Sequence, residues 1–161
     1  DAILVHYKVK EASVRAVAAG DNGAVWEDAC VEFFSIPAGD GIYYNVECNC
    51  AGTLLIGAGA GRENREHAPQ EVMDKVQRWS SLGRQSFEER VGECNWELAL
   101  VIPYSAFFKH QITSLDGKTV RANFYKCGDK LQTPHFLSWN PIALEKPNFH
   151  CPEFFGTLNF E

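Results

Sequence analysis

Hydrophobic and polar residues alternate along most of this chain, and the alternation predicts strands because successive side chains of a strand point to opposite faces. Residues 29–34 show the pattern well. One face holds Ala29, Val31 and Phe33, and the other holds Cys30, Glu32 and Phe34. If the first face packs on a core, Trp26 at the strand entry and Glu32 both look outward. An aromatic plane beside a hydrogen-bonding acid suits a sugar ring, although a tryptophan at such a position equally suits packing.

The same alternation predicts strands over residues 3–9, 13–17, 42–50, 53–56, 85–91, 96–102, 119–127, 135–139 and 157–160. Pro69 stands at a first helical position, and apolar residues follow at helical spacing as far as Trp79. This spacing predicts one short surface helix from Pro69 to Trp79. Many short strands with a single helix predict an all-β protein, a β-sandwich of jelly-roll type. We expect the Trp139 ring to be buried beneath the proline-rich loop that follows it.

Three rows of polar side chains fall on the outward faces of the predicted strands. They are Glu32, then Asn45, Glu47 and Asn49, then Arg121, Asn123 and Tyr125. If the rows lie on different sheets, each is simply a solvated face. If they lie side by side, they form a polar surface that can bind a ligand. The pattern alone leaves both interpretations open.

Composition describes one soluble domain over residues 1–161, since 45% hydrophobic and 22% charged content suffices for a core. The net charge of −6 comes from dispersed acidic residues, which argues against nucleic-acid partners and favours a neutral ligand. No apolar run approaches the ~20 residues that a membrane-spanning helix needs. Because the first residue is Asp, we expect that an N-terminal segment, such as a strand, has been trimmed.

The six cysteines are expected to be buried free thiols for the most part. Cys48 and Cys50 point the same way on one strand, which suits neither a disulfide nor a zinc knuckle. A metal cluster of Cys94, Cys127 and His150-Cys151 would require contacts that the sequence does not predict. Metal ligands therefore stay unassigned.

Several motifs follow one another from about Val25 to the C-terminus. They are Trp26-Glu-Asp-Ala-Cys-Val-Glu32-Phe-Phe, Tyr43-Tyr-Asn-Val-Glu-Cys-Asn, Arg121-Ala-Asn-Phe-Tyr-Lys-Cys-Gly-Asp129, Ser138-Trp-Asn-Pro141 and Phe149-His-Cys-Pro-Glu-Phe-Phe-Gly156. In this order they resemble the family 9 carbohydrate-binding modules, and most closely the family-9-like domains common in gut Bacteroidetes. The resemblance implies a non-catalytic β-sandwich that grips the terminal sugar of a glucan or xylan between two aromatic rings.

The resemblance also implies the residues of a site. The first ring falls on Trp26, the acid on Glu32, and the second ring on Phe149, where the family has a tryptophan. Asn45 stands where the family has an arginine, and Tyr125 takes the place of a polar residue of the late strand. We expect Trp26 and Phe149 as the walls of a shallow slot, Glu32 and Asn45 as its floor and Tyr125 at its side. No cofactor is required; a structural calcium ion is possible in this family, but no acidic loop with calcium-ligand spacing stands out.

Carbohydrate binding in polysaccharide catabolism is thus the leading hypothesis, with a mono- or oligosaccharide as the partner. We expect a monomer with an extracytoplasmic location, whether periplasmic, cell-surface or secreted. One alternative is a glycoside hydrolase that uses Glu32 with Glu47, since glycosidases place two acids about 5–9 Å apart across the scissile bond. The other alternative is an accessory structural domain whose slot has lost its sugar.

Overall fold

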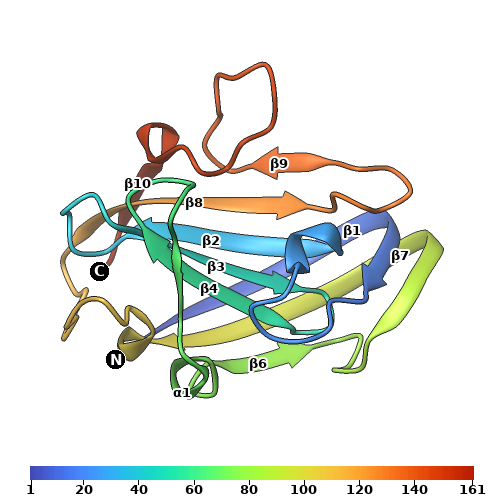
Figure 1. Cartoon of the computed structure of the whole chain (residues 1–161), viewed down its shortest axis with the longest axis horizontal. Coiled ribbons are helices and arrows are strands. Elements are labelled where there is room, and N and C mark those ends of the chain that lie inside the picture. Colours follow the sequence, from blue (N-terminus) through green and yellow to red (C-terminus); the bar gives the residue numbers. More distant parts are fainter.

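The computed structural model describes residues 1–161 as two antiparallel β-sheets packed face to face (Figure 1). The smaller sheet has the order β1 (Ala2–Ala16), β7 (Phe87–Pro103), β6 (Gln77–Ser80). The larger sheet has the order β10 (Gly156–Asn159), β8 (Thr119–Cys127), β2 (Cys30–Ile36), β3 (Tyr43–Asn49), β4 (Leu54–Gly59), β5 (Glu66–His67), and β9 (Phe136–Ser138) also pairs with β8. The predicted all-β sandwich is confirmed.

Helical segments are short. The one α-helix is α1 (Gln70–Met73), and three 3-10 turns are η1 (Val25–Glu27), η2 (Tyr104–Ala106) and η3 (Pro152–Phe154). No helix has the length and apolar character needed to span a membrane.

The main core lies between the two sheets and contains 29 buried residues. Around β2, the predicted inward set of Ala29, just before the strand, and Val31 and Phe33 within it belongs to this core. Removal of these apolar side chains from water is what holds the sheets together. The other face of β2 therefore points away from the core, and it is available for a site.

Two long strands replace four predicted ones. The segments expected at 3–9 and 13–17 join as β1, and those expected at 85–91 and 96–102 join as β7. The two strands pair along their length, with register shifts between Glu11 and Ser13 and between Val14 and Ala16. The break expected between residues 9 and 13 is thus a shift of register within one strand, as at a β-bulge, which kinks a strand without ending it.

The predicted helix from Pro69 to Trp79 is too long. It ends at Met73, and β6 then pairs with β7, with Trp79 opposite Ala99. The apolar residues Val72, Met73 and Val76 are buried, as their spacing predicts, but the Trp79 side chain is 55% exposed. Residues 77–80 therefore form a strand through backbone pairing with β7, although their apolar spacing suits a helix.

The prediction of a buried Trp139 ring is also wrong, because the side chain is 53% exposed. After Trp139 the chain leaves the sheet as a long loop (top of Figure 1) that packs over the outer face of the larger sheet and not over the ring. The ring instead packs edge-on against Phe124, at a centroid distance of 5.8 Å. Together with residues 3–7 of β1, it lines an apolar groove.

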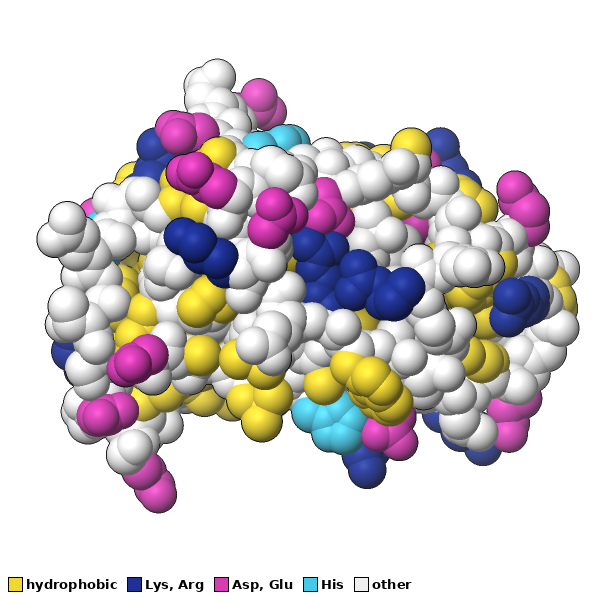
Figure 2. Space-filling model, turned by 90° about the horizontal axis from the view of Figure 1, so that it is seen from below, with side chains coloured by type: hydrophobic (Ala, Val, Ile, Leu, Met, Phe, Trp, Pro, Cys, Tyr) yellow, Lys and Arg dark blue, Asp and Glu magenta, His cyan; other side chains and the backbone are white.

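Figure 2 shows the face of the molecule seen from below. Acidic, basic and hydrophobic side chains are interspersed on it. This face therefore offers no broad surface of a single charge.

Candidate functional site

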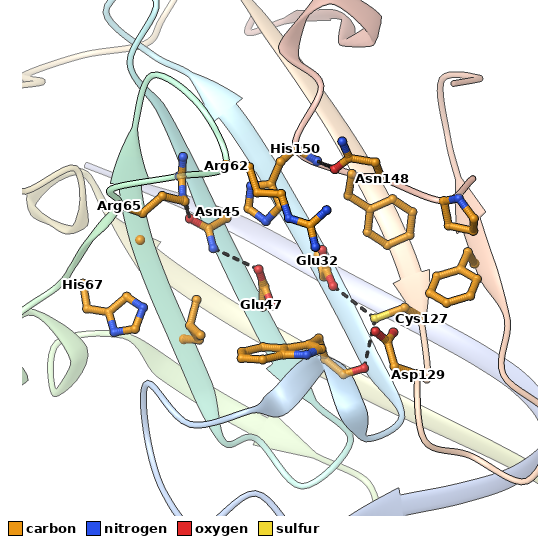
Figure 3. Close-up of a pocket in the computed structure, with 16 residues that line it drawn as sticks. Glu32, Asn45, Glu47, Arg62, Arg65, His67, Cys127, Asp129, Asn148 and His150 are labelled. Carbon is orange, nitrogen blue, oxygen red and sulfur yellow. Dashed lines mark hydrogen bonds between the residues drawn. The ribbon is translucent and has the colours of Figure 1, made fainter. Parts of the chain in front are cut away.

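A cavity of about 370 Å³ lies on the outer face of the larger sheet. Its floor comes from four adjacent strands: Leu55 and Gly57 of β4, Asn45 and Glu47 of β3, Glu32 of β2, and Cys127 at the end of β8. Its rim comes from three connecting segments, which supply Trp26 of η1, Arg62 and Arg65 after β4, and Asn148, Phe149 and His150 before η3 (Figure 3). We call this cavity the pocket.

The alternation of side chains along the strands explains the floor. Glu32 lies opposite Glu47 across the β2–β3 pair and opposite Tyr125 across the β2–β8 pair, so all three point away from the core. The predicted polar rows therefore do lie side by side. Apart from the exposed Arg121 they are not solvated, however: Glu32 is only 2% exposed and Asn45 is buried, because η1 and the two loops cover this face.

Four of the five residues expected at a site line the pocket, namely Trp26, Glu32, Asn45 and Phe149. Tyr125 does not line it. Its buried ring lies beneath Phe149, with the two rings stacked at a centroid distance of 4.1 Å and an interplanar angle of 7°. Its hydroxyl donates a hydrogen bond of 3.2 Å to the Phe149 carbonyl. Tyr125 thus holds Phe149 in place at the rim of the pocket.

Trp26 is 39% exposed, whereas its neighbour Val25 is fully buried. Val25, and not Trp26, is therefore the residue that packs into the protein at the entry to the strand. The Trp26 carbonyl accepts a hydrogen bond of 3.1 Å from the Asp129 backbone N–H. A second contact of 3.5 Å comes from the Cys127 thiol. These bonds fasten η1 to the end of β8 and fix the ring at the rim.

Arg65 lies against Asn45, the residue that stands where the family has an arginine. Its guanidinium donates to Asn45 Oδ1 at 2.7 and 3.0 Å, and it lies over the Tyr43 ring at 3.9 Å. Further bonds go to the carbonyls of Tyr43, Gly59 and Gly61. Asn45 in turn donates to Glu47 Oε1 at 2.9 Å. An arginine from a loop thus supplies the positive charge that β3 lacks.

Gly57 makes this arrangement possible, because a Cβ at its position would lie 2.6 Å from Asn45 Oδ1. The Gly/Ala run over residues 57–61 is therefore closely packed at Gly57.

Arg62 differs from Arg65, since its exposed guanidinium makes no hydrogen bond or ion pair with another residue. Figure 3 shows it reaching over the pocket toward Glu32. Its donors are therefore available to a ligand.

The acids of the pocket are held away from their ordinary titration range. Burial, and then the neighbouring Glu47, raise the pKa of Glu32 well above its usual value. Burial raises the pKa of Glu47 to about 7, against the opposing effects of the Asn45 amide and Arg65. Partial burial and Glu27 raise the pKa of Asp129 at the rim. Perturbed acids that converge on a cavity are typical of functional sites.

His150 shares a hydrogen bond of 2.7 Å with the Tyr43 hydroxyl through Nδ1. Burial, followed by the charges of Arg65 and Arg62, lowers its pKa to about 4. The ring is therefore neutral at neutral pH.

Metal-ligating side chains converge at one place. Cys30, Glu32 and Cys127 are buried, and their ligand atoms lie within 4.8 Å of one another. The cluster considered from the sequence, of Cys94, Cys127 and His150-Cys151, does not form, and all six cysteines are free thiols. A set that includes two thiols does not suit calcium, which takes oxygen ligands. No group of three acidic side chains that would fit a family calcium ion converges elsewhere.

Sequence reasoning missed Arg62, Arg65 and Asp129 as pocket residues. Arg62 and Arg65 stand in a charged loop with no periodicity, and nothing local predicts that the loop folds back over β3. Asp129 could have been found, because it closes the motif that begins at Arg121 and ends in Cys127-Gly-Asp129.

An antiparallel sandwich with an aromatic-rimmed, polar-floored pocket on one sheet face defines a ligand-binding β-sandwich module. The model of carbohydrate-binding family 9 matches residues 1–160, and the chain therefore belongs to this family. A crystal structure of a "putative carbohydrate-binding protein" from Bacteroides uniformis ATCC 8492 is 72% identical in sequence, with a TM-score of 0.97. The match covers 99% of this chain and 73% of that chain. No curated protein sequence matches the chain.

Proposed function

We propose that the pocket binds a terminal sugar unit of a plant-type glucan or xylan without catalysis, between Trp26 and Phe149. The observation that supports this most is the convergence of Trp26, Glu32, Asn45 and Phe149 on one cavity from four separate segments. Membership of carbohydrate-binding family 9 supports the same class of ligand. Such a module would serve polysaccharide catabolism outside the cytoplasm.

A pyranose presents an apolar C–H face and a rim of hydroxyl groups. Trp26 and Phe149 offer aromatic faces for the first, and the carboxyl oxygens of Glu32 and Glu47 offer acceptors for the second. The Arg62 guanidinium adds free donors above the floor. The pocket therefore combines few polar groups with rigid apolar walls, which is usual for small-ligand sites.

The size and charge of the pocket favour a small, neutral ligand. A volume of about 370 Å³ lies at the small end of ligand pockets, which span about 300–1,000 Å³. The acids Glu32, Glu47 and Asp129 face two arginines, so neither charge dominates. One or two uncharged sugar units suit this lining better than a polyanion does.

Calorimetric titration with mono- and oligosaccharides tests the proposal. The wild type should bind, and Trp26→Ala should lose about 1–3 kcal/mol, the cost of exposing one apolar face. Trp79→Ala is the matched control, because Trp79 is also a half-exposed tryptophan but lies outside the pocket. If Trp26→Ala binds as well as Trp79→Ala does, or if the wild type binds no saccharide, the proposal fails.

One observation favours a second candidate, a glycoside hydrolase. Glu32 and Glu47 are paired across β2 and β3, and burial raises the pKa of each. Glycosidases, however, place their acids on either side of the scissile bond, whereas these two rise from one floor. If the wild type hydrolyses aryl glycosides and both Glu32→Gln and Glu47→Gln lose this activity, the result would favour the enzyme over the binding module.

A further inference from the structure

We infer that Cys30, Glu32 and Cys127 form a binding site for one thiophilic divalent metal ion, such as Zn²⁺, at the floor of the pocket. The inference goes beyond saccharide binding and does not depend on it. The ligand atoms of all three side chains lie within 4.8 Å of one another. Two thiols and a carboxylate form a donor set that zinc accepts and calcium or magnesium does not.

The strands place these side chains firmly. Cys30 and Glu32 are two residues apart on β2 and so point to the same side of the sheet. Cys127 lies directly opposite Cys30 on β8. β2 is bordered by β8 and β3, and β8 by β2 and β10, so neither strand is at an edge of the sheet. Sites built on paired central strands need little rearrangement to close around an ion.

The spacing is close to that of a metal site. Zn–S bonds are about 2.3 Å and Zn–O bonds about 2.0–2.2 Å, so the ligand atoms of one tetrahedral site lie about 3.5 Å apart. The Cys127 sulfur lies 3.1 Å from Glu32 Oε1. Small side-chain rotations therefore suffice to admit the ion.

The surroundings of Glu32 are a second, independent observation. This side chain is only 2% exposed, yet its one hydrogen-bond donor in the protein is the Cys127 thiol, a weak donor. Buried carboxyl groups normally receive strong hydrogen bonds or a positive charge. The Cys30 thiol makes a long contact of 3.7 Å to the Val31 carbonyl and also interacts with the Cys127 thiol. A bound cation supplies a strong partner to the Glu32 carboxylate.

Charge and proton balance are consistent with this site. Binding of Zn²⁺ releases the two thiol protons to solvent, together with the proton of Glu32 where that group is protonated. Two thiolates, one carboxylate and the ion then carry a net charge of −1. Arg62 and Arg65, which carry the opposite charge, line the same pocket.

The pocket also provides a route for the ion. Glu32 and Cys127 line the pocket, so one side of the site is open to it. Three protein ligands leave a fourth tetrahedral position for a water molecule or a ligand hydroxyl. This arrangement is that of an open zinc site and not of a closed structural one.

Titration of the reduced, metal-free protein with Co²⁺, in the absence of any saccharide, tests the inference. We expect one equivalent to bind with a thiolate-to-metal charge-transfer band of two-thiolate intensity, and Zn²⁺ to displace it. Cys30→Ser and Cys127→Ser should each weaken binding by at least about tenfold. Cys48→Ser should bind as the wild type does, because Cys48 is a buried cysteine on the core face of the same sheet.

If the wild type shows no charge-transfer band, the inference is wrong. This outcome does not depend on whether any variant folds. Unchanged Co²⁺ binding in a folded Cys30→Ser protein overturns the inference equally, because the ion then binds elsewhere. So does a Cys30–Cys127 disulfide in the purified protein combined with no metal binding after reduction. In support, Zn²⁺ should raise the melting temperature of the wild type and of Cys48→Ser but not that of Cys30→Ser.

Discussion

Among single residues, we expect Glu32 to lower the stability of the fold and to contribute to ligand binding. A buried carboxyl group with only a thiol donor destabilises the folded state, and the amide of Gln carries no charge to desolvate. In metal-free protein, Glu32→Gln should therefore melt at the same or a higher temperature. Saccharide affinity should fall about 10- to 150-fold, since hydrogen bonds to a charged group contribute about 1.5–3 kcal/mol.

Thermal unfolding and calorimetry of this one variant give both results. If Glu32→Gln binds saccharide normally, the carboxylate does not accept sugar hydroxyls. If instead it melts many degrees lower, the residue serves the fold and not the ligand.

We expect Tyr125 to act through Phe149, as a positioning residue. Tyr125→Phe keeps the stacked ring and loses one hydrogen bond to the Phe149 carbonyl, so stability should fall by about 0.5–1.5 kcal/mol with affinity nearly unchanged. Tyr125→Leu removes the stacking surface and should lower saccharide affinity several-fold. Equal affinity in both variants, each shown to be folded, would mean that the Phe149 ring needs no support.

The strand pattern predicted which residues share a face of the sheet but not how deeply they are buried. Period-two alternation alone separates Glu32 and Asn45 from Val31 and Phe33. The burial of Glu32 depends on loops without periodicity, and these return to β2 from more than a hundred residues away at Phe149. No local pattern could predict that cover.

At the scale of elements, the loop after β4 is anchored to β3 through Arg65 and Asn45. Gly57→Ala on β4 places a Cβ 2.6 Å from Asn45 Oδ1 and should displace this contact. We expect a drop in stability of about 1–3 kcal/mol, as for other overpacked sites, and weaker saccharide binding.

Gly61→Ala is the matched control, since a Cβ at Gly61 meets nothing within 4 Å. Urea unfolding and calorimetry of the two variants compare them directly. If Gly57→Ala behaves as Gly61→Ala does, the Arg65–Asn45 contact is not what shapes the pocket.

An element could be predicted where the burial of one face decides its structure. It could not be predicted where pairing with a distant strand decides it. The alternation found every strand of the larger sheet except the two-residue β5. It failed at residues 77–80, where the apolar spacing suits a helix but β7 offers an unpaired edge. Pairing depends on a partner distant in sequence, so a local spacing cannot reveal it.

For the whole molecule, His150 couples stability to pH. Its pKa is about 4 in the folded protein, whereas an unperturbed histidine titrates near 6.5, so the unfolded chain binds more protons between these values. The contribution of His150 to stability should therefore fall as pH is lowered from 6.5 to 4, whereas the raised pKa of Glu47 acts in the opposite direction over much of this range. The full shift corresponds to roughly 3.4 kcal/mol, and solvent at the partly buried ring should reduce it to about 1–2 kcal/mol.

Melting temperature followed against pH tests this linkage. His150→Gln has no titrating ring, so its melting temperature relative to that of the wild type should rise as pH is lowered over that range. His67→Gln removes an exposed pocket histidine as the control and should follow the wild type. Parallel curves for the wild type and His150→Gln would contradict the linkage.

The sandwich keeps its core and its pocket on opposite faces of one sheet. The 29 residues of the main core include none of the pocket residues, so changes in the pocket need not disturb the packing of the sheets. This separation is what allows the saccharide-binding claim to be tested by substitution without loss of the fold.

The four tryptophans provide the most direct measurement of the central claim, that saccharide binds in the pocket. Trp26 lines the pocket, Trp79 and Trp139 are exposed elsewhere, and Trp96 is in the core. Their indole N–H signals can be followed together in ¹H–¹⁵N NMR spectra as an oligosaccharide is added. We predict a saturable shift of the Trp26 signal with the other three nearly unchanged. A Trp26 signal that stays in place while the Trp79 or Trp139 signal shifts would contradict the account.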